Sequence, residues 1–139
     1  MVLVGKLHPL LVHFPIGLIL AAAAAELVAI HTGRADWRAI AVANLRTGAA
    51  MGALTAIAGW GLASAHFVEP SRVLAWHGGI GAAGAVCALG AALLSTGAHD
   101  GTRGRLIAYR AALFGAAALV AVAGHLGAAL VWGADFLRP

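Results

Sequence analysis

Charged residues are scarce in this sequence. Asp, Glu, Lys and Arg together make up 10% of its 139 residues, whereas hydrophobic residues make up 62% and the mean hydropathy is +0.92. A soluble domain of this size cannot bury so large a share of apolar side chains. The composition therefore excludes an ordinary soluble domain and indicates an integral membrane protein.

Cysteine is almost absent. The single Cys87 lies inside an apolar run, which excludes an intrachain disulfide, a CxxC redox motif and a CxxCH site for covalent haem. Acidic residues are also few, five against nine Lys and Arg. The basic residues occupy short breaks between apolar runs and not one face of a helix, so the pattern indicates membrane topology and no nucleic-acid partner.

Four apolar runs account for nearly the whole chain. A helix needs about 20 apolar residues to cross a bilayer core, and each run has about this length. The sequence predicts an all-α fold, a single domain over residues 1–139 that forms a bundle of four transmembrane helices. We expect these helices at about 9–31, 40–66, 73–95 and 106–133. Pro15 is expected to kink the first of them.

Small residues are frequent in these runs and allow helices to approach closely. Gly48 and Gly52 form a GxxxG pattern. This pattern is typical of packing within one chain and also of a homodimer seam, and the sequence leaves both open.

The arginines indicate the orientation in the membrane. Two loops and the helix ends beside them carry three arginines each, Arg34, Arg38 and Arg46 in one case and Arg103, Arg105 and Arg110 in the other, whereas the middle loop carries only Arg72. The positive-inside rule then places both termini on the periplasmic side of a bacterial cytoplasmic membrane. Aromatic belts are expected from Trp60, Trp76, Trp132 and Phe136 at the outer interface and from Trp37 and Tyr109 at the inner one.

Five of the seven histidines fall on the predicted outer side: His8, His13, His66, His77 and His125; the other two, His31 and His99, fall on the inner side. His13, His77 and His125 belong to three different predicted helices and lie about 6 to 12 Å below their outer ends, at 1.5 Å per residue. Histidines within a membrane usually turn toward a partner and often mark functional sites. We therefore expect these three side chains to point into the bundle.

A neutral imidazole is a ligand for haem iron, copper or zinc, and helix bundles build such sites from facing helices. Glycines follow His77 and flank His125, and such surfaces would make room for a flat porphyrin. Zinc and copper sites more often include carboxylates or thiolates, which the outer halves of the predicted helices lack. The sequence thus favours haem and leaves copper or zinc as the alternative.

The polar residues near the predicted inner helix ends include one acid. Glu26 is expected to pair with Arg46 or Arg110, because charges within a membrane are usually paired. A proton or quinone role for Glu26 is the alternative.

Three histidine motifs carry a family resemblance. The string HPLLVHFPIG at residues 8–17 resembles the start of a bacterial membrane-protein family, the domain of unknown function 2231, and WHGG at 76–79 and GHLG at 124–127 are similar to its other motifs. The resemblance covers essentially the whole chain and falls on His8, His13, His77 and His125, whereas His66 matches no motif and is a weaker ligand candidate. It implies redox work, because some members are attached to or encoded beside c-type cytochrome domains.

The leading functional hypothesis is a membrane protein with one or two b-type haems. His8, His13, His77 and His125 are the cofactor-binding candidates, and the last three are the preferred axial ligands. Two axial histidines give an iron suited to electron transfer, here between a membrane donor such as quinone and a periplasmic acceptor such as a c-type cytochrome. No nucleophile with its base is evident, so we expect an electron-transfer protein or subunit more than a stand-alone enzyme. The alternatives are copper or zinc binding and a structural subunit of a redox complex.

Overall fold

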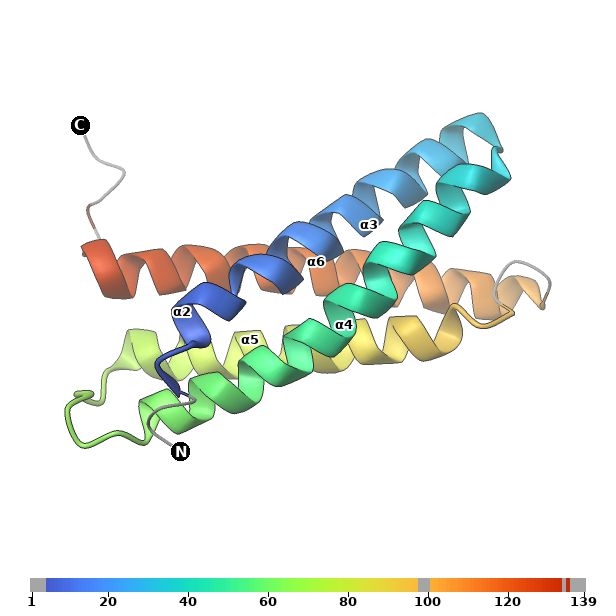
Figure 1. Cartoon of the computed structure of the whole chain (residues 1–139). Helices are drawn as coiled ribbons and strands as arrows, with labels where there is room; N and C mark the ends of the chain where they lie inside the picture. Colours follow the sequence, from blue (N-terminus) through green and yellow to red (C-terminus); the bar gives the residue numbers. More distant parts are fainter. Residues whose placement is uncertain (1–4, 98–100, 134, 136–139) are drawn as a thin grey trace.

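The computed structural model describes residues 5–97, 101–133 and 135, and its long elements are all helices (Figure 1). They are α2 (His8–Leu11), α3 (His13–Thr32), α4 (Ala35–Ala63), α5 (Arg72–Leu94) and α6 (Arg103–Trp132). The described ranges contain no strand. Four spans, of 25, 29, 23 and 30 residues, are long and apolar enough to cross a membrane. The predicted all-α bundle of four membrane-spanning helices is confirmed.

The first span is interrupted at Val12, between α2 and α3. Pro15 has no amide hydrogen to donate to the carbonyl of Leu11, one turn earlier, and α2 ends at that residue. Val12 keeps helical dihedral angles, φ −59° and ψ −28°, so the two helices remain one span. The expected distortion near Pro15 therefore separates a short helix that carries His8.

The bounds of α4 differ from the prediction at both ends of the helix. This helix begins at Ala35 because the extended Arg34 precedes it and bonds Asp36 in its first turn, where an acid favours the positive end of the helix dipole. It ends at Ala63, so His66 lies in the turn after the helix and not within it. Gly33, with φ of 70°, closes α3 in the left-handed conformation that glycine adopts readily.

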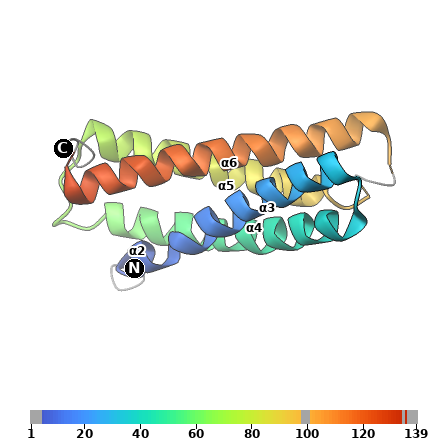
Figure 2. The same cartoon turned by 90° about the horizontal axis from the view of Figure 1, so that it is seen from above.

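The helices form two hairpins that cross one another. The helices α3 and α4 pack closely together, as do α5 and α6, and contacts of α4 with α5 and of α3 with α6 join the two pairs. Figures 1 and 2 show that the turn between α3 and α4 diverges from the start of α6. At the opposite end of the molecule, α2 lies close to the end of α4 and the beginning of α5.

The core is made mainly of alanines, with Ile19, Leu45 and Leu113 fully buried among them. Gly48 lies against α3, since a Cβ there would be 2.9 Å from Ile19 Cγ1. Gly52 lies 3.7 Å, by the same measure, from Pro15 Cβ. The GxxxG pattern therefore serves helix packing within the chain.

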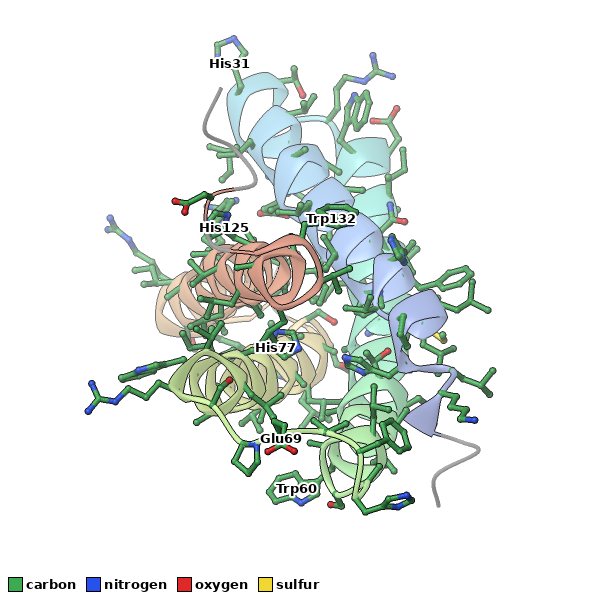
Figure 3. The ribbon with its side chains drawn as sticks, turned by 90° about the vertical axis from the view of Figure 1, so that its left-hand side faces the viewer. His31, Trp60, Glu69, His77, His125 and Trp132 are labelled. Carbon is green, nitrogen blue, oxygen red and sulfur yellow. The ribbon has the colours of Figure 1, made fainter. Side chains whose placement is uncertain are left out.

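Large apolar side chains cover much of the outer surface, as a lipid environment allows. Trp60, Trp76 and Trp132 are 75%, 65% and 71% exposed, and Figure 3 shows Trp60 and Trp132 at the end of the bundle that carries Glu69. The predicted inner belt is wrong for Tyr109, which is fully buried because its hydroxyl bonds a buried carboxylate. Phe136 lies outside the described residues.

Candidate functional site: a pair of histidines

The segment before α3 is packed tightly onto the end of α4. Gly5 is buried there, and a Cβ at this position would lie 2.6 Å from the backbone nitrogen of Leu62. Beyond it, His8 Nδ1 lies 3.0 Å from the carbonyl oxygen of Thr55. The imidazole covers Gly59, where a Cβ would be 2.8 Å from the ring Cε1. A Cβ at this position would therefore require the ring of His8 to shift.

His77 repeats this arrangement in the other hairpin. Its Nδ1 lies 2.9 Å from the carbonyl oxygen of Ala123 on α6. Its ring faces Gly127, where a Cβ would be 3.1 Å from the ring Cε1. Ser71 fixes the start of α5, since its hydroxyl accepts a hydrogen bond from the amide of Leu74. Each hairpin thus holds one imidazole between a carbonyl and a glycine.

These hydrogen bonds determine which ring nitrogen is free. A carbonyl oxygen only accepts, so Nδ1 of His8 and of His77 must carry the hydrogen and donate it. In the neutral ring the lone pair for a metal then belongs to Nε2. Metal-binding histidines are usually held in this way, with the second ring nitrogen donating to a carbonyl or carboxylate.

The two imidazoles lie next to one another. Their ring centroids are 6.0 Å apart and their planes make an angle of 83°. With nitrogen–metal bonds of about 2 Å and roughly 1 Å from nitrogen to ring centre, two imidazoles on opposite sides of one ion lie about 6 Å apart. The centroid separation of His8 and His77 is close to that distance.

The other candidate histidines do not join this pair. His13 and His125 are exposed, and Figure 3 shows His125 on the outer side of α6. The expectation that both point into the bundle is wrong, because the rise per residue gives the depth of a side chain and not the helix face that carries it. His66 is exposed and contacts Phe67, and His31 is exposed at the far end. His99 lies outside the described residues.

The packing of His8 on Gly59 can be tested directly. Gly59→Ala is expected to lower the free energy of unfolding of the purified protein in detergent by about 1–3 kcal/mol, and with it the melting temperature, because the new methyl displaces His8. This is the usual cost of a side chain forced into a packed site. Gly90→Ala is the control, since a Cβ there would have nothing within 4 Å of it and alanine favours a helix. Equal melting temperatures for the two variants would contradict the packing of His8 on Gly59.

A second polar cluster lies in the half of the bundle that carries Arg34 and Arg103, which we call the arginine-bearing half. Arg110 Nε donates to Glu26 Oε1 at 2.8 Å, and the hydroxyl of Tyr109 donates to Oε2 at 3.3 Å. Glu26 is fully buried. The predicted pairing of Glu26 is confirmed with Arg110, whereas Arg46 bonds Ser95 and Thr96. No sequence pattern pointed to Tyr109, because neighbouring residues point to different sides of a helix.

Comparison with known proteins identifies the family. The model of the family described as "Predicted membrane protein (DUF2231)" matches residues 5–136, which include every residue of the histidine pair and of the Glu26 cluster. No curated protein and no solved structure matches the chain. The family match covers nearly the whole sequence and agrees with the four membrane-spanning helices. The chain therefore belongs to the DUF2231 family of predicted membrane proteins.

Proposed function

We propose that this protein binds b-type haem, with His8 and His77 as the two axial ligands. The observation that supports the proposal is the adjacent, nearly perpendicular pair of rings at 6.0 Å, each with Nδ1 held by a carbonyl of another helix. This tautomer leaves Nε2 of each ring with its lone pair for iron. This assignment keeps two of the four candidate histidines expected from the sequence, which left the pairing of ligands open.

The donor set favours haem over a bare ion. Zinc sites take three or four protein ligands, and no group of three or more metal-binding side chains occurs within residues 5–97, 101–133 and 135. Haem supplies four nitrogens itself and needs only axial ligands from the protein. Gly78 and Gly79, next to His77 in the sequence, have open space where a Cβ would be.

The residues of the pair suit electron transfer. A bound haem supplies a one-electron couple of its iron. The carbonyls of Thr55 and Ala123 fix the tautomer and orientation of the two rings, and such hydrogen bonds make a ligand nitrogen more basic. Two histidine ligands leave no open position for a substrate. The chain therefore fits an electron carrier or the electron-transferring subunit of a complex.

The position of the pair suggests where the electrons go. His77 lies at the end of the bundle that carries Trp60 and Glu69 (Figure 3), opposite the end that carries Arg34 and Arg103. By the positive-inside rule the arginine-bearing end faces the cytoplasm. The haem would then lie near the periplasmic face of the membrane, between a donor such as quinone and an acceptor such as a c-type cytochrome.

The experiment is to purify the protein from cells supplied with haem and to record its spectrum. We expect a Soret band, with α and β bands after reduction, and a stoichiometric haem content. A content of one haem per chain fits the His8 and His77 pair, and two would require further ligands. Protein without haem would refute the proposal, and colourless protein with stoichiometric copper or zinc would support the alternative metal site.

The orientation can be tested separately by cysteine labelling. In a Cys87→Ala background, a cysteine at Glu69 is expected to react with an impermeant reagent added to intact spheroplasts. A cysteine at Asp100, between α5 and α6, is expected to react only after lysis. The reverse result would place the histidine pair near the cytoplasm and remove the periplasmic acceptor.

A further inference from the structure

An open groove runs along the seam between α4 and α5. Toward the arginine-bearing end it has a volume of about 480 Å³. Its walls are apolar, with Ala49, Ala50, Leu89 and Leu93 among them, and Arg46 lies at its mouth. A second groove of about 520 Å³ shares Leu89 and extends along the same seam to Trp60. The two grooves meet at Leu89, are lined mainly by apolar side chains, and have Arg46 in the lining of the first.

Two arginines converge on the turn that ends α5. Arg46 Nε donates to Ser95 Oγ at 3.2 Å and its NH2 group donates to Thr96 Oγ1 at 3.1 Å. Arg105 Nε donates to the carbonyl oxygen of Leu94 at 3.3 Å. Neither arginine forms an ion pair with a carboxylate in the part of the chain that the structure describes. Two guanidinium groups from different helices thus lie beside residues 94–96, and no carboxylate among the described residues forms an ion pair with either.

The guanidinium of Arg46 lies beside the end of α5, one of the four candidate membrane spans. Arg46 belongs to the apolar part of α4, but its guanidinium reaches residues 95 and 96, just past the end of α5. Long basic side chains extend in this way to keep the charge at the membrane interface. An arginine has five N–H donors, so Arg46 retains donors beyond those that its two hydroxyl partners occupy.

We propose that this groove binds an anionic phospholipid. The phosphate would contact Arg46 and Arg105, since guanidinium groups recognise phosphate by paired hydrogen bonds. One acyl chain would lie along Ala49, Ala50, Leu89 and Leu93. A free phosphate ion would leave the apolar walls unused, and a second copy of the chain would not neutralise the two cations. The site is independent of the histidine pair and of the haem.

Native mass spectrometry of the protein in a neutral detergent tests the proposal, with dioleoyl phosphatidylglycerol and dioleoyl phosphatidylcholine as probes. We expect phosphatidylglycerol to bind at least about fivefold more tightly. Arg46→Gln and Arg105→Gln should each weaken its binding about fivefold, the usual contribution of one basic residue near an anionic headgroup. Arg46→Lys should lose less than Arg46→Gln, and Leu89→Trp should weaken binding of both lipids by filling the groove.

Arg72→Gln is the matched control, because Arg72 is an exposed arginine at the other end of α5. It should leave binding unchanged. The proposal is overturned if both lipids bind equally, if Arg72→Gln weakens binding as much as Arg46→Gln, or if inorganic phosphate competes as well as the lipid. A dimer without bound lipid would also overturn it, in favour of a second copy on the groove. Circular dichroism confirms that each variant is folded, and Leu89→Trp keeps the test valid if an arginine variant is not.

Discussion

Replacing His8 or His77 with alanine is expected to abolish stoichiometric haem binding. If the proposed assignment is right, each substitution would remove one of the two histidines that hold the haem and would leave the iron with a single bond to the protein. The haem content and the reduced-minus-oxidised spectrum of each variant in detergent give the result. His31→Ala is the control, because His31 is exposed at the far end of the bundle (Figure 3), and it should retain the full spectrum.

The same series separates the proposed pair, His8 and His77, from the ligand candidates preferred from the sequence, His13, His77 and His125. His13→Ala and His125→Ala should retain haem, since both side chains are exposed. Loss of haem in these variants and not in His8→Ala would show that the ligands are different histidines. A His77→Gly variant that regains the spectrum with added imidazole would show that the lost ligand, and not a folding defect, explains the loss. Haem retained in both His8→Ala and His77→Ala would refute the assignment.

The second large effect is expected at the opposite half of the bundle. Arg110→Ala removes the cation that pairs with Glu26, whose side chain is fully buried, while the side chain of Arg110 itself is 26% exposed. An unpaired buried charge costs about 3–5 kcal/mol, so the variant should unfold at a much lower temperature in detergent. Glu26→Gln should cost less, because Arg110 can extend toward water. The double variant that combines Glu26→Gln with Arg110→Ala should be more stable than Arg110→Ala alone.

Arg34→Ala is the matched control for this prediction. It also breaks an arginine–carboxylate pair, with Asp36, but both side chains are largely exposed, 64% and 55%. Exposed pairs contribute little, so its melting temperature should stay close to that of the unmodified protein. An Arg110→Ala variant as stable as Arg34→Ala would mean that Glu26 is neutral or finds another partner.

The sequence predicted the number and approximate positions of the helices because lipid allows few other arrangements. Every backbone group in the membrane must be bonded within the chain, so long apolar runs become helices. The pairing of Glu26 could be predicted for a related reason, since a charge at that depth needs a partner. The choice between Arg46 and Arg110 was not accessible, because it depends on the rotation of α4 and α6 about their axes.

The histidine pair could be predicted only in part. The sequence named His8 and His77 as candidates but favoured His13 and His125 over His8. That preference rested on a similar depth on three different helices and on neighbouring glycines. It did not include the contact of His8 with the backbone of α4, which brings His8 beside His77. Gly59 was the residue in the sequence that could have pointed to His8. Its role becomes evident only in the structure, where the ring of His8 lies against it.

The two-hairpin architecture has a consequence for assembly. His8 is anchored to α4 and His77 to α6, so each hairpin positions one imidazole of the pair. Hairpins are natural units of membrane insertion, and neither alone contains the pair. A group bound by both histidines would link the two hairpins. It would shift the equilibrium between separated and docked hairpins toward the docked state by mass action. Residues 1–66 and 67–139, expressed as separate polypeptides, would then associate more tightly when haem is supplied than when it is withheld.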